Sequence, residues 1–149
     1  YGLAYAKAQM SAGNSLPIKG MVAVSLCNKD KDKLLPSVEE LAAMGFEICA
    51  TGGTHDFLMS KNIKCSRVDK VGEGSPNIVD LISGKKISLL INTPSDDKSQ
   101  FDAAAMRRAA LTNSIPYVTT KAAAIAAVEG IKALRKGEIT VTSLQEYNA

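Results

Sequence analysis

The chain of 149 residues is 46% hydrophobic and 22% charged, which excludes a disordered protein and fits one globular domain. Its net charge of +3 is spread along the sequence, so we expect no nucleic-acid partner. No apolar run approaches the roughly 20 residues that span a bilayer, and residues 1–20 lack a signal-peptide pattern. We therefore expect a cytoplasmic protein without a membrane partner.

Helical and strand patterns alternate along the chain. Residues 1–10 have the pattern of the end of a helix, and residues 11–20 form a linker that contains glycine, serine and proline. The strands predicted from short β-rich apolar runs are 21–27, 46–50, 64–68, 87–92 and 117–119. The helices predicted from apolar spacing are 32–44, 54–61, 78–83, 102–112 and 121–135. The segment 138–147 is either a further short strand or a packed tail.

This alternation predicts an α/β fold: a single three-layer α/β/α domain with a five-stranded parallel sheet, over residues 20–149. Ligands of such sheets bind beyond the carboxyl ends of the strands. The cysteines Cys27, Cys49 and Cys65 lack the spacing of a disulfide framework or a zinc site, so we expect no metal. They are predicted to be buried thiols inside strands.

The strongest candidate for a binding loop is ATGGT at residues 50–54, between a strand and a helix. The glycines let the backbone approach an anion closely, and Thr51 and Thr54 supply hydroxyl groups. The helix that follows offers free N–H groups and the positive end of its dipole. The loop therefore predicts a phosphate or carboxylate site. The alternative is a tight turn in which Thr54 is only the N-cap.

Three further loops at strand ends add polar groups to the same edge of the sheet. The loop after the first strand contains Ser25 and Lys31, and the glycine-rich segment 69–77 contains Lys70. Lysine pairs with phosphate as a point charge. Asn92 follows the central strand and offers donors and acceptors for a sugar or a base. Each residue alone is also an ordinary surface or turn residue, but together they predict an anion site.

Residues for catalysis do not form a recognisable set. His55 is the one histidine, and we expect it on the surface of a helix without a nucleophile beside it. Asp96, Asp97 and Asp102 stand where helix caps and first-turn acids are expected. The sequence therefore predicts a binding site without catalytic residues.

Three segments, ATGGT, DKVGEGSPNIVDLI at 69–82 and INTPS at 91–95, resemble the methylglyoxal-synthase-like domain superfamily, and the similarity extends from Gly20 to the end. Methylglyoxal synthases carry a catalytic aspartate where this sequence has Ser75, and serine cannot serve as that base near neutral pH. The related cyclohydrolase domain has a lysine- and histidine-rich segment that this sequence lacks. The sequence is most similar to the C-terminal allosteric domain of carbamoyl-phosphate synthase large chains.

The segments that carry this similarity are KVGEG at 70–74, INTPS at 91–95, MRRAAL at 106–111, YVTT at 117–120 and TSLQEY at 142–147. YAKAQ at 5–9 is similar to the end of the preceding ATP-binding domain, so residues 1–19 are expected to be the tail of that domain and a linker.

The resemblance implies a nucleotide effector whose phosphate binds the threonine–glycine loop. The residues implied for the phosphate are Thr51, Gly53, Thr54, Lys31 and Lys70, and those implied for the rest of the ligand are Ser25, Asn92 and Thr93. UMP-like and IMP-like effectors both remain open, because Gly52 and Pro94 replace residues of some bacterial members. The chain lacks the tryptophan of members that bind N-acetylglutamate.

The resemblance also implies a regulatory segment with no catalytic site and no cofactor of its own. The parent enzyme would use ATP and Mg²⁺ in pyrimidine and arginine biosynthesis. Its partners would be the ATP-binding domains of the same chain and a glutaminase small subunit. The rival hypothesis is a divergent phosphate lyase acting on dihydroxyacetone phosphate, with Glu73 or Asp69 as the base. A third is a structural domain for oligomer contacts.

Overall fold

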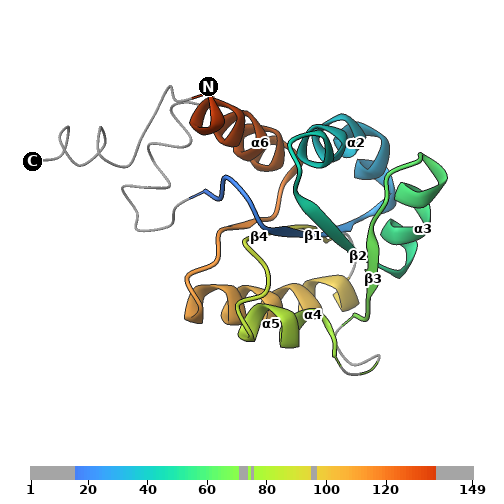
Figure 1. Ribbon diagram of the computed structural model, residues 1–149. Coiled ribbons are helices and arrows are strands. Elements are labelled where there is room, and N and C mark those ends of the chain that lie inside the picture. The colour runs from blue at the N-terminus through green and yellow to red at the C-terminus, as the bar shows by residue number, and fades with distance from the viewer. Residues whose placement is uncertain (1–15, 71–73, 75, 95–96, 137–149) are drawn as a thin grey trace, which may run out of the picture.

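The computed structural model describes residues 16–70, 74, 76–94 and 97–136. Strands and helices alternate through this part of the chain, as the sequence predicts (Figure 1). The strands are β1 (Met21–Leu26), β2 (Glu47–Thr51), β3 (Ser66–Val68), β4 (Leu89–Thr93) and β5 (Tyr117–Val118). The helices are α2 (Asn28–Ala43), α3 (Gly52–Ser60), α4 (Ile78–Ser83), α5 (Asp97–Thr112) and α6 (Lys121–Arg135).

The five strands form one parallel sheet in the order β3-β2-β1-β4-β5, which confirms the predicted α/β architecture. Helices α2 and α6 cover one face, and α4 and α5 cover the other (Figure 1). The chain adds β2 and β3 on one side of β1 and then returns to add β4 and β5 on the other. The sheet therefore has a topological switch point between β1 and β4, where such folds bind ligands.

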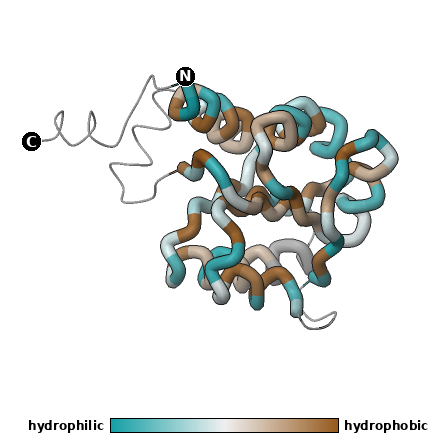
Figure 2. Tube along the Cα trace, in the orientation of Figure 1, coloured by the Kyte–Doolittle hydropathy of each residue, from teal (hydrophilic) through white to brown (hydrophobic). Residues whose placement is uncertain are grey.

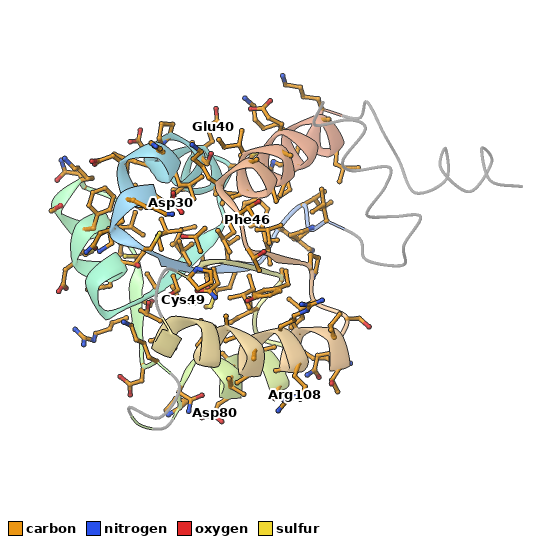
Figure 3. All side chains as sticks on the ribbon, turned by 180° about the vertical axis from the view of Figure 1, so that it is seen from behind. Asp30, Glu40, Phe46, Cys49, Asp80 and Arg108 are labelled. Carbon is orange, nitrogen blue, oxygen red and sulfur yellow. The ribbon has the colours of Figure 1, made fainter. Side chains whose placement is uncertain are left out.

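Two hydrophobic clusters fill the space between the layers. Val22 and Val24 of β1 pack in the cluster under α2, α3 and α6, while Ala23 packs in the cluster over α4 and α5. Figure 2 shows the same division, with apolar segments inside and polar segments on the outer helix surfaces. Figure 3 shows Cys49 between the helical layer that carries Glu40 and the layer that carries Asp80 and Arg108. Strands buried on both faces are typical of parallel sheets.

The helices differ at their amino ends. Asn77 caps α4, because its side chain accepts hydrogen bonds from two backbone N–H groups and the Asp80 carboxylate accepts one from the Asn77 N–H at 2.8 Å. Thr120 caps α6 and accepts from the Ala123 N–H at 3.1 Å. The N-cap residues of α2 and α3 are Cys27 and Thr51, and neither makes a side-chain capping bond. The first-turn N–H groups of α2 and α3 are therefore without a side-chain cap.

Two element boundaries differ from the expectation in ways that bear on function. Helix α2 begins at Asn28, one turn before the predicted start at residue 32, so Lys31 belongs to a helix and not to a loop. Helix α3 begins at Gly52, so the glycine pair forms its first turn. Thr51 rather than Thr54 is its N-cap, and the alternative role suggested for Thr54 is wrong.

The described start of the chain packs against the domain. Leu16 belongs to the first hydrophobic cluster, and the Ile18 carbonyl accepts a hydrogen bond from the Arg135 guanidinium. The expected helix end at 1–10 and the expected segment at 138–147 lie outside the described residues. In the described part of the chain, none of the helices has the length and apolar character needed to cross a membrane.

Candidate functional site

All the residues that the sequence predicts for the site line one cavity of about 230 Å³ at the carboxyl ends of β1, β2 and β4. They are Ser25, Lys31, Thr51, Gly53, Thr54, Lys70, Asn92 and Thr93. The cavity lies where the order of the strands reverses, next to β1. The structure brings these residues together, and their role in binding a ligand stays a prediction.

One end of the cavity is positively charged and rich in hydrogen-bond donors. Lys31 lies in the first turn of α2, and its Nζ donates to Asn28 Oδ1 at 2.8 Å. The same Nζ lies 3.4 Å from where a Cβ on Gly53 would be, so the ammonium group sits beside the first turn of α3. Lys70, which follows β3, also lines the cavity. Two helix starts without side-chain caps and two lysines therefore face one space.

Two threonine hydroxyls of the predicted site are used within the fold. Thr54 Oγ1 accepts from the Leu26 N–H at 3.0 Å and lies 3.4 Å from the Leu26 carbonyl, which joins α3 to the end of β1. Thr93 Oγ1 accepts from the Cys27 N–H at 3.2 Å and joins the end of β4 to the start of α2. Both threonines are buried. Thr54 is therefore better placed to offer a ligand its backbone N–H than its hydroxyl.

Ser25, Thr51 and Asn92 form a polar row across β1, β2 and β4. Ser25 pairs with Asn92 in the sheet register, and Thr51 Oγ1 donates to Ser25 Oγ at 2.9 Å. Alternation along the strands places the row on the face that α4 and α5 cover, beside Ala23, Cys49 and Leu90. Within the described residues, the Ser25 hydroxyl accepts this bond and has no acceptor for its own hydrogen, so it can donate to a ligand.

Tyr117 is a residue at this site that the sequence did not suggest. Asn92 Nδ2 donates to Tyr117 Oη at 3.3 Å, and Tyr117 Oη donates to the Ala103 carbonyl at 3.3 Å. Burial raises the pKa of the Tyr117 phenol, although the Asn92 hydrogen bond and the positive charge of Arg107 act in the opposite direction. The phenol is therefore protonated at neutral pH. The sequence indicates only that Tyr117 belongs to a predicted strand. In the sheet it pairs with Leu90, which lies on the same face as Asn92.

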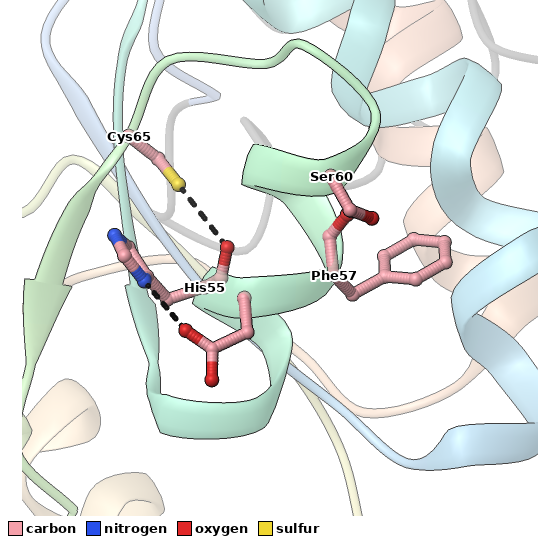
Figure 4. Close-up of polar contacts among 5 residues, drawn as sticks. His55, Phe57, Ser60 and Cys65 are labelled. Atoms are coloured by element: carbon pink, nitrogen blue, oxygen red, sulfur yellow. Dashed lines mark hydrogen bonds and ion pairs between the residues drawn. The ribbon is translucent and has the colours of Figure 1, made fainter.

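His55 lies outside the cavity. Its Nδ1 contacts Asp56 Oδ1 at 3.2 Å, and its carbonyl accepts from Cys65 Sγ at 3.9 Å (Figure 4). No hydroxyl or thiol nucleophile pairs with it among the residues that the structure describes. The described residues also contain no group of histidine, cysteine and carboxylate side chains that could hold a metal ion.

The cysteines depart in part from the expectation that they are buried inside strands. Cys49 is buried in β2, and burial together with the nearby Cys65 raises its pKa to about 11. Cys65 precedes β3 and is half-buried, so that part of the expectation is wrong. Cys27 follows β1 as the N-cap of α2 and lines the cavity, because β1 ends at Leu26, one residue before the predicted end of the strand.

Of the carboxylates considered as bases or caps, Asp69 is described and is not one of the residues that line the cavity. Glu73, Ser75 and Asp96 lie outside the described residues, and for Asp97 and Asp102 only the backbone in α5 is described. The described lining of the cavity contains no carboxylate. The described lining is therefore suited to an anion and offers no carboxylate as a proton acceptor.

Comparison with solved structures supports the fold. The chain is similar to methylglyoxal synthase from Elizabethkingia anophelis, with a TM-score of 0.62 and 20% identity over 76% of this chain and 79% of that one. It is also similar to ForH, with a TM-score of 0.61 and 15% identity over 84% of this chain and 85% of that one.

Comparison with curated proteins finds relatives along the whole chain. The large chain of carbamoyl phosphate synthase from Acidobacterium capsulatum is 48% identical over 100% of this chain and 14% of its own length. Its C-terminal section from Methanopyrus kandleri is 45% identical over 99% of this chain and 28% of its own length. The chain thus spans less than a third of these relatives. The resemblance expected from the sequence is confirmed.

A family model places the chain among domains named after methylglyoxal synthase. The model described as "MGS-like domain" matches residues 33–119, which include Lys70 and the strands that line the cavity apart from β1, while Lys31 lies just before the matched range. The match covers more than half of the chain, and the fold of the solved neighbour agrees with it. The chain therefore belongs to the family of MGS-like domains.

Proposed function

We propose that the chain is the effector-binding regulatory domain of a carbamoyl phosphate synthase large chain. In this proposal a nucleoside monophosphate of the UMP or IMP type binds in the 230 Å³ cavity. The observation that carries the proposal is the pair of helix starts without side-chain caps, with Lys31 and Lys70, around one space. The curated relatives at 45–48% identity support the identity of the parent enzyme.

The phosphate would bind at the positive end of the cavity. Backbone N–H groups at the start of α3 and the Lys31 ammonium group would neutralise its charge, and Gly53 leaves room for close approach. A hydrogen bond to a charged group contributes about 1.5–3 kcal/mol. Ser25 and Asn92 would bind the sugar or the base, because they lie in the polar row beside the positive end.

The domain would act without turnover or a cofactor of its own. An effector changes a distant reaction only by binding two states of the enzyme with different affinity. The reaction with ATP and Mg²⁺ would take place in the ATP-binding domains of the same chain, with a glutaminase subunit as further partner. The rival phosphate lyase is not favoured, since the described lining of the cavity offers no carboxylate as base.

Calorimetric titration with UMP and IMP tests the proposal. We expect saturable binding of at least one nucleotide, and Lys31→Met should weaken it about ten- to a hundredfold by removing one charged hydrogen bond. Lys33→Met is the matched control, because Lys33 lies exposed on the same helix outside the cavity and should change the affinity less than twofold. The proposal would be contradicted if neither nucleotide binds, or if the two variants change the affinity equally.

Two assays separate the proposal from its rivals. In the complete enzyme that carries this sequence, the nucleotide should change the rate of carbamoyl phosphate formation, and Lys31→Met should reduce that response while Lys33→Met preserves it. An unchanged response in both variants would favour a structural domain. Incubation of the chain with dihydroxyacetone phosphate should release no methylglyoxal, and sustained release would establish the lyase instead.

A further inference from the structure

The Asn92 side chain is a nearly buried polar group in the wall of the cavity. The residue is 4% exposed and stands in the polar row at the end of β4. Its carboxamide has a donor side, Nδ2, and an acceptor side, Oδ1. The two sides have different partners, which decides what the cavity offers a ligand.

The direction of the amide follows from the chemistry of its neighbours. A backbone carbonyl only accepts hydrogen bonds, so Tyr117 uses its single hydroxyl hydrogen for the Ala103 carbonyl at 3.3 Å. The oxygen of Tyr117 can then only accept, and the group that donates to it at 3.3 Å must be Asn92 Nδ2. The raised pKa of the buried phenol preserves its hydrogen at neutral pH. Asn92 Oδ1, the opposite side of the amide, has no donor among the described residues.

We propose that Tyr117 is a positioning residue that holds Asn92 as a hydrogen-bond acceptor, so that the cavity selects phosphate esters that carry an N–H or O–H donor away from the phosphate. This inference rests on the proposed function, and it concerns the part of the ligand away from the phosphate. A buried acceptor left without a donor weakens binding by about ten- to a hundredfold. The positive end of the cavity then sets affinity for phosphate, and Asn92 sets the choice among phosphate esters.

Donor-deleted analogues of the nucleotide test this inference. The probes are UMP, its N3-methyl derivative and its 2′-deoxy and 3′-deoxy derivatives, each of which lacks one donor, together with inorganic phosphate. For the original chain we expect one deletion to weaken binding about tenfold or more. In Tyr117→Phe the ring remains but the amide can turn, so the same deletion should cost less than about threefold. Affinity for inorganic phosphate should stay within twofold.

Matched variants separate positioning from a general disturbance of α5. Asn113→Ala removes another side-chain bond to this helix, the 2.8 Å bond from Nδ2 to the Ala109 carbonyl, and should leave the donor penalty as in the original chain. Asn92→Leu removes the acceptor and should abolish the penalty, which keeps the inference testable if Tyr117→Phe folds poorly.

The outcomes distinguish this inference from the proposed function. Binding of UMP with no penalty for any donor deletion, or a penalty that Tyr117→Phe and Asn92→Leu both preserve, would overturn the inference alone. If the original chain binds none of UMP, IMP and inorganic phosphate, the proposed function is overturned and this inference with it.

Discussion

The amino ends of α4 and α6 differ from those of α2 and α3. Asn77 and Thr120 cap the first pair with side-chain hydrogen bonds, and both are polar residues outside the cavity. Cys27 and Thr51 stand at the same position of the second pair without such bonds, and both line the cavity. A helix without a side-chain cap is less stable than a capped helix by about 1 kcal/mol. Among the four helices whose N-cap residues are described, the two that lack side-chain caps are those whose starts face the proposed anion.

In this domain, one pair of helix starts stabilises the fold and the other pair is left to bind a ligand. Thr51 is a residue type that commonly caps helices, yet its hydroxyl donates to Ser25 across the sheet. The N–H groups of α3 therefore stay without a side-chain partner, and a phosphate could complete the helix in place of a cap. Caps elsewhere would stabilise the fold in the absence of a ligand.

The largest expected effect comes from giving α3 the cap that it lacks. In Thr51→Asp, a carboxylate would occupy the N–H groups meant for the phosphate and repel it, so UMP affinity should fall at least about a hundredfold. The matched control is Thr120→Asp at the start of α6, which should leave UMP affinity within twofold. Calorimetry measures both variants, and preserved binding in Thr51→Asp would show that the start of α3 does not hold the anion.

Bound UMP should stabilise the folded chain, and this stabilisation should depend on contacts at the uncapped starts of α2 and α3. UMP at a hundred times its Kd should raise the free energy of unfolding by about 2.7 kcal/mol, because it binds the folded state alone. Urea unfolding with and without UMP measures this increment. At the same UMP concentration Lys31→Met should keep only about 0.4–1.4 kcal/mol of this increment, and Lys33→Met should preserve it. A similar increment in Lys31→Met would place the ligand elsewhere.

Removal of the α4 cap should affect stability without binding. Asn77→Ala removes the side-chain half of a reciprocal capping box, in which Asn77 Oδ1 accepts from the Val79 N–H at 2.9 Å and from the Asp80 N–H at 3.2 Å, and should cost about 1–2 kcal/mol. Urea unfolding gives the stability, and titration should show UMP affinity within twofold of the original. A large loss of affinity would show that the start of α4 also contributes to binding.

The smallest expected effect concerns the α6 cap. Thr120→Ala removes one hydrogen bond, from the Ala123 N–H at 3.1 Å, and should cost about 0.5–1 kcal/mol with unchanged UMP affinity. The control is Thr112→Ala in the last turn of α5, whose hydroxyl only bonds the Arg108 carbonyl and whose loss should cost less than about 0.5 kcal/mol. Thermal unfolding of the two variants should resolve this order.

Periodicity predicted most elements because apolar spacing is a local property. Helices 78–83 and 121–135 were predicted with the observed bounds, since apolar runs and flanking caps mark both ends. The starts of α2 and α3 were not. Residues 28–31 are polar and give no periodic signal, and glycine has a low helix propensity, so 52–53 resembled a loop. These residues are helical because of where β1 and β2 end in the sheet, and the local sequence pattern does not reveal those ends.

The residues of the candidate site could be predicted because parallel strands end at a common edge. Strand order and side-chain contacts could not. Tyr117 reaches Asn92 only through the register of β4 with β5, which two short apolar runs leave undetermined. The sequence cannot distinguish a threonine hydroxyl that binds a ligand from one that bonds within the fold. The hydroxyls of Thr54 and Thr93 each bond a backbone group of another element. Their binding roles remain predictions.

The hydrogen bond between the Cys27 N–H and Thr93 Oγ1 joins positions 66 apart in the sequence. Closing such a long loop costs entropy that only later contacts recover, so long-range parallel pairing is slow. The pocket forms only after β1 and β4 have paired, so the nucleotide cannot bind the chain in the early steps of folding. A nucleotide that recognises only the assembled pocket should therefore act on the lifetime of the native state, slowing its unfolding and leaving the rate of folding unchanged.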